Sequence, residues 1–298
     1  MSAVQLLLLA LAITTVLFVI VLGLYLRRAA VAGQKVAPSF GAFLIGTVAN
    51  FFDTIGIGSF ATTTTALRAG RMIDDAKLPG TLNVGYATAA LFQSFLFIAA
   101  VEVDPTTLIA MMGAAIAGAW VGAGWFSKWP KRNIQLGMGA ALIIAGALFI
   151  YKNAVGDPVG GNLTGVTGMK LVAAVAGNFV LGVMMTIGVG LYGPCMLLIA
   201  LLGMSPRTAF PIMMGSCAFL MPIAGTRFLK ENAADLRISF ALALSALPGV
   251  WLAYKFFSNL DVAKLRWLVA FVVLIAGIML IRAALQHRAP AAETAPKT

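Results

Sequence analysis

Residues 54–65 read TIGIGSFATTTT, and residues 186–197 read TIGVGLYGPCML. The two stretches share the order Thr-Ile-Gly-x-Gly, and each lies inside a long apolar run. An interior glycine weakens a helix by roughly 1 kcal/mol, so we expect both runs to break here. In a membrane, lipid does not satisfy the backbone groups that a break exposes, so the break lies within protein or lines a wet cavity. Two matched breaks therefore predict a binding site between two repeats.

Composition places these stretches in a membrane protein. Of the 298 residues, 61% are hydrophobic and 10% are charged, whereas a soluble domain carries about 25% charged residues. We predict an all-α polytopic membrane protein with about nine hydrophobic segments. The formal charge of +11 fits Lys and Arg in short loops, where they set orientation and meet anionic lipid headgroups. The chain has no basic run with interleaved aromatics, so nucleic acid is not an expected partner.

Cysteine and histidine are too few for a metal centre or a catalytic dyad. Cys195 and Cys217 are the only cysteines, and His287 in the tail is the only histidine. The sequence therefore predicts neither a metal site nor a cofactor. It contains no visible nucleophile–base pair, so we do not expect an enzyme. It also has no nucleotide-binding motif, which favours coupling to an ion gradient over ATP.

The apolar segments define the expected domain organisation. Residues 4–26 form an apolar helix with basic residues after it, which indicates a retained helix and not a signal peptide. The further segments are expected at 39–67, 82–101, 106–126, 134–151, 170–203, 207–225, 237–256 and 265–285. The predicted regions are an N-terminal helix with its linker (1–35), repeat 1 (36–152), an inter-repeat loop (153–169), repeat 2 (170–286) and a disordered tail (287–298).

Further matches support a duplication. Gly118 and Trp120 recur as Gly249 and Trp251, and the Ile-Ala-Gly that ends at Gly146 recurs. Each predicted repeat is a glycine-broken helical hairpin followed by three transmembrane helices.

The positions of Lys and Arg predict how the repeats are oriented. If both broken segments cross the membrane, the 21 Lys and Arg divide 11 to 10. If both segments return to the side from which they start, the division is 15 to 6. The larger group then lies at 27–35, 68–77, 128–132, 227–237 and from Arg282 onward. The positive-inside rule favours this second arrangement. A hairpin plus three helices makes an odd number of crossings, so the repeats would be inverted.

A half-helix that starts at each break would present free N–H groups and a positive dipole end, which suits an anion. Gly58 or Ser59 is the expected cap of the first half-helix, and Pro194 is expected at the first position of the second. The candidate binding residues are Thr54, Gly56, Gly58, Ser59, Thr62, Thr63, Asn83, Tyr86, Thr186, Gly188, Gly190, Tyr192, Gly193 and Cys195. The alternatives are that the hydroxyl and amide groups join helices by hydrogen bonds and that Cys195 is a small core residue.

Asp53 stands directly before the first break, and its counterpart in the second copy is Met185. A carboxyl group at this depth is a functional-site hypothesis by default. Three roles are open: a proton-coupling group, a cap for the exposed helix end, and a partner for a nearby arginine.

The second stretch, with Gly188, Gly190 and the run from Tyr192 to Cys195, resembles the glycine-rich signature of the TauE/SafE family of sulfite and organosulfonate exporters, also called toluene-sulfonate uptake permeases. The resemblance extends over about residues 40–285. It implies a multi-pass carrier of small sulfur-containing anions in the bacterial inner membrane. The first copy departs from the family pattern, because it has neither three glycines in a row nor a proline.

These observations together predict a secondary transporter for a small anion, sulfite or an organosulfonate. The direction of export is what the resemblance implies. The anion would lie between the two broken-helix tips near the midplane, and transport would be proton-coupled or anion-coupled. One alternative is a carrier of a cation or a neutral solute with Asp53 as ligand. The other is a non-catalytic partner in a membrane assembly.

Overall fold

The structure is a computed structural model that describes residues 2–125, 131–156, 159–186 and 190–286. The described residues form helices and no strand. In the part of the chain that the structure describes, eight helices are long and apolar enough to cross a membrane, in agreement with the prediction of an all-helical, multi-pass membrane protein. The predicted tail (287–298) and Lys128 of the predicted basic loop lie outside the described residues.

The helices are α1 (Ala3–Val31), α2 (Phe40–Thr54), α3 (Phe60–Ala69), α4 (Leu78–Ala100), α5 (Pro105–Trp125), α6 (Lys131–Ala154), α7 (Gly168–Thr186), α8 (Tyr192–Leu201), α9 (Ala209–Lys230), α10 (Leu236–Ser258) and α11 (Val262–Gln286). Short 3-10 turns, η1 (Asp75–Lys77) and η3 (Pro206–Thr208), precede α4 and α9. Each predicted broken segment divides into two helices, α2 with α3 and α7 with α8.

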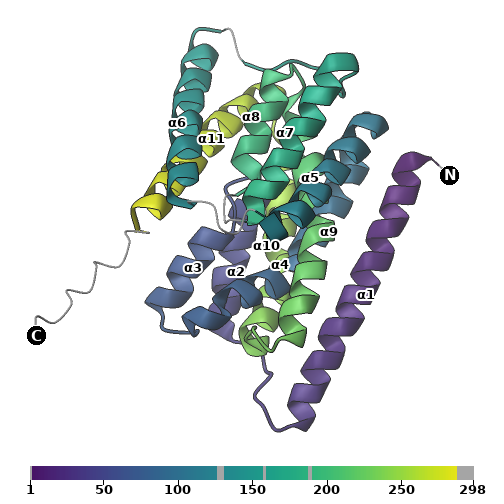
Figure 1. The fold of residues 1–298 in the computed structure, drawn as a ribbon, viewed down its shortest axis with the longest axis vertical. Coiled ribbons are helices and arrows are strands. Elements are labelled where there is room, and N and C mark those ends of the chain that lie inside the picture. Colours follow the sequence, from purple (N-terminus) through teal and green to yellow (C-terminus); the bar gives the residue numbers. More distant parts are fainter. Residues whose placement is uncertain (1, 126–130, 157–158, 187–189, 287–298) are drawn as a thin grey trace, which may run out of the picture.

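The connecting turns gather at two opposite ends of the bundle (Figure 1). At the end that is lower in Figure 1, the Asp235 N–H donates to the hydroxyl of Thr81 at 2.8 Å, and Arg237 Nε donates to the carbonyl of Ala37 at 3.2 Å. At the upper end, the N–H groups of Asp104 and Ser205 donate to carbonyls of residues 164 and 163, both at 2.9 Å. These contacts fix which chain turns share an end.

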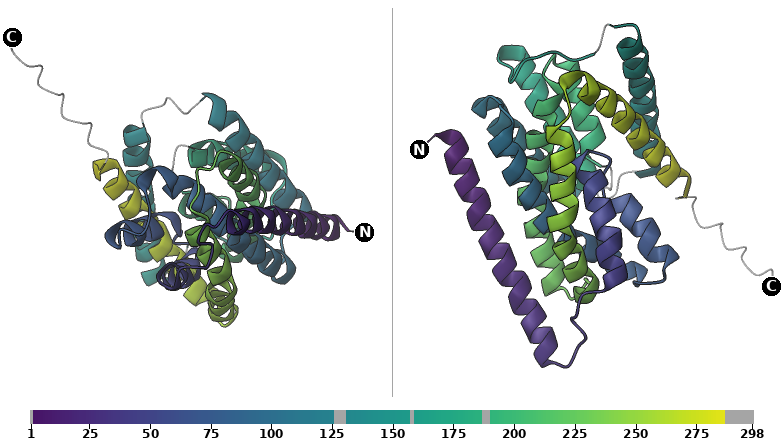
Figure 2. Two further views of the ribbon diagram at one scale, coloured as in Figure 1. Left: turned by 90° about the horizontal axis from the view of Figure 1, so that it is seen from below. Right: turned by 180° about the vertical axis from the view of Figure 1, so that it is seen from behind.

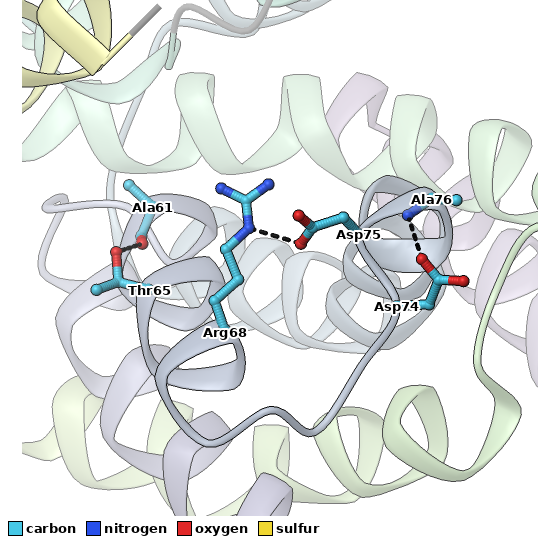
Figure 3. Close-up of polar contacts among 6 residues, drawn as sticks. All are labelled: Ala61, Thr65, Arg68, Asp74, Asp75 and Ala76. Atoms are coloured by element: carbon cyan, nitrogen blue, oxygen red, sulfur yellow. Dashed lines mark hydrogen bonds and ion pairs between the residues drawn. The ribbon is translucent and has the colours of Figure 1, made fainter.

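The hairpin of α2 and α3 begins and ends at the lower end. A Cβ on Gly41, at the start of α2, would lie 3.3 Å from the Met72 methyl group that follows α3. Arg68, near the end of α3, forms an exposed ion pair with Asp75 at 2.7 Å (Figure 3). With 15 and 10 residues, α2 and α3 are about 22 and 15 Å long, short of the roughly 30 Å hydrocarbon core. The segment therefore starts and ends at the same end of the bundle, and each of its two helices is shorter than a membrane span.

The second broken segment returns to the upper end. Lys170, near the start of α7, donates to the carbonyl of Leu202, which follows α8, at 3.3 Å. The α7–α8 hairpin lies in the upper half of Figure 1, and the α2–α3 hairpin lies in the lower half.

Four helix pairs make up most of the packing: α4 with α9, α6 with α11, α5 with α7, and α2 with α10. Small residues allow close approach within them. A Cβ on Gly118 would lie 2.0 Å from the carbonyl oxygen of Phe179, and one on Gly249 would lie 2.5 Å from that of Thr47. Helix α1 stands at the edge of the bundle (Figure 2), where it packs on α4 and α9.

Two of these pairs run antiparallel. In the α4–α9 pair, Gly80 near the start of α4 contacts Phe228, and Val84 one turn later contacts Gly225. In the α6–α11 pair, Gly139 faces Ile281. Later in α6, a Cβ on Gly146 would lie 2.8 Å from the backbone nitrogen of Leu274, and one on Gly277 would lie 2.8 Å from that of Ile143.

Candidate functional site

The first break is a tight turn that depends on two glycines. Helix α2 ends at Thr54 and α3 begins at Phe60. Between them, Gly56 has a φ of +103° and Gly58 a φ of +88°, in the region that residues with a Cβ rarely adopt. A Cβ on Gly56 would also lie 2.3 Å from the Met196 methyl group, so the turn is both left-handed and closely packed. No heavy atom lies within 4 Å of the corresponding position at Gly58.

Asp53 closes this turn with its side chain. The carboxyl group is buried, and Oδ1 accepts the N–H of Ser59 at 2.7 Å. Oδ2 accepts a hydrogen bond from Gln93 Nε2 at 3.0 Å. Ser59 occupies the N-cap position of α3 as expected, but its hydroxyl makes no capping hydrogen bond. The chain thus places one of its own carboxyl groups where the helix N-terminus favours an anion.

Gln93, on α4, is the centre of the hydrogen-bond network. Its Nε2 also donates to the Thr54 hydroxyl at 2.9 Å. Its Oε1 accepts the hydroxyl of Tyr192 at 3.4 Å. Because Tyr192 is the first residue of α8, this single amide joins the half-helix of the second break to the first break.

The threonine run of α3 contributes one buried hydroxyl. Thr63 hydrogen-bonds to the hydroxyl of Tyr86 on α4, and both side chains are buried. The Thr62 hydroxyl donates to the carbonyl of Ser59 and does not join the network. Thr65 likewise donates to Ala61 within its own helix (Figure 3).

The structure describes only part of the second break. Gly188 and the side chain of Thr186 lie outside the described residues. Gly190 is exposed, and no heavy atom lies within 4 Å of the position that a Cβ would take. Gly193 packs closely on α11, because a Cβ there would lie 2.5 Å from the Ala276 methyl group. The Cys195 side chain is fully buried.

The sequence predicted Pro194 at the first helical position of α8, and this prediction is wrong. Helix α8 begins two residues earlier, at Tyr192. The hydrogen bond that begins the helix runs from the N–H of Cys195 to the carbonyl of Leu191, at 3.0 Å. Because proline has no N–H, the first turn of α8 offers fewer free donors than an ordinary helix start.

The structure does not bring Asn83 to the network. Its amide donates to the carbonyl of Pro79 in its own helix at 2.9 Å. Gln93 was not among the candidate binding residues, although a polar amide inside an apolar segment was the available signal. Its partners are distant in sequence, so its role follows only from the fold.

The environment of Asp53 consists of neutral donors. The carboxyl group forms no ion pair with any residue that the structure describes. Nor do three or more His, Cys, Asp or Glu gather anywhere in the described part of the chain in a way that could hold a metal ion. The geometry suits a helix cap or an exchange of anions better than a cation site.

No family model, curated protein or solved structure matches this chain. The interpretation of the site therefore depends on its own geometry.

Proposed function

We propose that this protein is a secondary transporter of a small anion, of the class of sulfite and organosulfonates. The observation that carries the proposal is the hydrogen-bond path through Asp53, Gln93 and Tyr192, which links two helix breaks inside a membrane bundle. Broken helices that meet in this way are typical of transporter binding sites. The resemblance to the sulfite exporter family gives the substrate class, the direction of export and the bacterial inner membrane.

The proposal includes two inverted repeats, and equivalent contacts support it. Thr47 precedes Thr54 by as many residues as Phe179 precedes Thr186. The close contact of Thr47 with Gly249 thus matches that of Phe179 with Gly118.

Antiparallel packing supports the inversion. Helices α4 and α9 occupy equivalent places in the two proposed repeats, as do α6 and α11. Both pairs run antiparallel, and equivalent helices that run in opposite directions imply repeats of opposite orientation. The basic turns at 68–77 and 227–237 lie at the lower end, which by the positive-inside rule faces the cytoplasm.

In the mechanism that we propose, Asp53 and the substrate anion compete for the same donors. When the carboxyl group is ionised, it accepts the Ser59 N–H and the Gln93 amide. Protonation of Asp53 weakens these bonds and frees the N–H groups at the start of α3 for an oxyanion. Binding of one anion is thus coupled to uptake of one proton by Asp53. Movement of one repeat against the other then exposes the site to each side of the membrane in turn.

The contacts of Asp53 disfavour the cation carrier. Each carboxyl oxygen already accepts a hydrogen bond from an N–H donor, and a cation would require oxygen ligands directed at it. An anion carrier should keep ligand binding in Asp53→Asn, whereas a cation carrier that uses Asp53 as ligand should lose it.

The test is the thermal stabilisation of the purified protein by a panel of anions. A ligand at about 100 times its Kd adds about 2.7 kcal/mol to the apparent stability. We expect sulfite or one sulfonate to stabilise the protein while chloride at the same ionic strength does not. Thr63→Val and Gly190→Val should weaken this response. A panel in which only cations or neutral solutes stabilise the protein would contradict the proposal.

A further inference from the structure

A small cavity lies near the upper end of the bundle, between α6, α8 and α11. Its volume is about 10 Å³, which is the space for one water-sized occupant. Asn153 at the end of α6 and Arg266 near the start of α11 contribute its polar lining. Phe149, Met196 and Val269 contribute apolar lining.

Both polar residues present a buried donor without a partner. Asn153 Nδ2 and Arg266 Nε make no hydrogen bond with any residue that the structure describes. A buried donor left unsatisfied costs about 1 to 3 kcal/mol, so two of them in one cavity call for an acceptor. The guanidinium is held in place from its other side, where Nη2 donates to Asn162 Oδ1 at 3.4 Å.

The charge around the cavity also favours an anion. No carboxylate is among the described residues that line it. The nearby Asp261 is engaged with Lys264 at 3.1 Å and with the start of α11. The positive charge of Arg266 therefore stays without a carboxylate partner in the described part of the chain.

One layer of side chains separates the cavity from the first break. Met196 lines the cavity, and its methyl group lies 2.3 Å from the position of a Cβ on Gly56. On α11, Val269 lines the cavity, and Val272 lies 3.3 Å from that same position. A methionine side chain is flexible and adapts its shape, and Met196 is the side chain that lies between the two sites.

We propose that Asn153 and Arg266 form an oxyanion-binding vestibule on the exit side, which the substrate reaches from the first break by passing Met196. This inference rests on the proposed function. Two N–H donors, one of them charged, suit the oxygens of sulfite or a sulfonate. In this conformation Met196 closes the vestibule to the size of one water molecule.

The experiment is equilibrium exchange of radiolabelled sulfite in proteoliposomes, which does not depend on the direction of transport. Loss of a hydrogen bond to a charged group costs about 1.5 to 3 kcal/mol, so Arg266→Gln should raise the half-saturating sulfite concentration roughly tenfold or more. Its maximal exchange rate should stay within about twofold of the wild type. Asn153→Asp, which replaces a donor with an acceptor of the same shape, should raise the half-saturating concentration at least as much.

Lys264→Gln is the matched control, because it removes the same charge two residues away on the exposed side of α11. Its half-saturating concentration should equal that of the wild type. If Arg266→Gln and Asn153→Asp also behave like the wild type while sulfite exchange is normal, the vestibule is wrong and the proposed function stands. If the wild type neither exchanges sulfite nor is stabilised by any anion, both are overturned. Should Arg266→Gln fail to fold, Arg266→Lys and Asn153→Asp decide the question.

Discussion

The half-helices α3 and α8 follow equivalent breaks and are both 10 residues long, yet they are held in different ways. Helix α8 buries six of its residues, including Gly193 to Met196. Helix α3 buries only Thr63 and Leu67, and its start is held by the Asp53 carboxyl group. Packing fixes α8, whereas a few directional hydrogen bonds fix α3. Hydrogen bonds can be exchanged for bonds to a ligand, so we expect α3 to be the element that moves and α8 to be the anchor.

The largest expected effect comes from Gly56→Ala. The left-handed conformation costs a residue with a Cβ roughly 1 to 2 kcal/mol, and moving the flexible Met196 side chain away from the new methyl group adds to this cost. We expect a clear fall in the midpoint of thermal unfolding in detergent. The control is Gly190→Ala in the second break, where a Cβ meets open space and the midpoint should not change. An equal fall in the unfolding midpoint of both variants would contradict the difference that we describe between the two breaks.

Asp53→Asn should lower the free energy of unfolding by about 1 to 3 kcal/mol, because an amide nitrogen then faces the Gln93 donor. Adding Gln93→Glu restores a donor and acceptor pair with the roles reversed, so the double variant should recover part of the loss. The readout is thermal unfolding of both single variants and the double variant. If the double variant loses more unfolding free energy than the two single variants together, hydrogen bonding at the start of α3 does not hold the first break.

Thr63→Val should cost about 1 kcal/mol, since it removes the buried hydrogen bond to Tyr86. Tyr86→Phe should cost a similar amount. The double variant leaves neither group unpaired, so its loss should be smaller than the sum of the two. A double-mutant cycle on the unfolding free energy measures this coupling. If the two losses of unfolding free energy are strictly additive, the hydrogen bond between Thr63 and Tyr86 is not what holds α3 on α4.

The smallest effect is expected at the outer end of α3. Arg68 and Asp75 form an ion pair with side chains that are 55% and 68% exposed, and such pairs contribute about 0 to 1 kcal/mol. Arg68→Gln should shift the unfolding midpoint slightly, and the shift should vanish at high salt. A loss as large as that of Asp53→Asn would mean that α3 is held from the loop side and not from the break.

The sequence predicted the breaks and the long apolar helices because both depend on local signals: glycines inside apolar runs, and runs of sufficient length. It also singled out Asp53, whose position beside the break is local. It did not predict the role of Gln93, because the partners of that amide come from α2 and α8. The start of α8 was misplaced because Tyr192 and Gly193 already have helical conformation ahead of the proline.

The vestibule residues show the same limit. Asn153 was assigned to the inter-repeat loop and Arg266 to the start of an apolar helix, and nothing in either segment indicates a shared cavity. The packing of α6 against α11 brings them together.

The pairing of α2 with α10 has a consequence for how the chain is made. The buried amide of Asn50 finds its partner, the hydroxyl of Ser245, 195 residues later in the sequence. At about 5 to 20 residues per second, α2 waits roughly 10 to 40 s after its own synthesis before that partner leaves the ribosome. During this interval α2 has its contacts with α3 and α4, but the face that carries Asn50 has no permanent neighbour in the membrane. We therefore expect the insertion machinery or a chaperone to shelter α2 until α10 arrives.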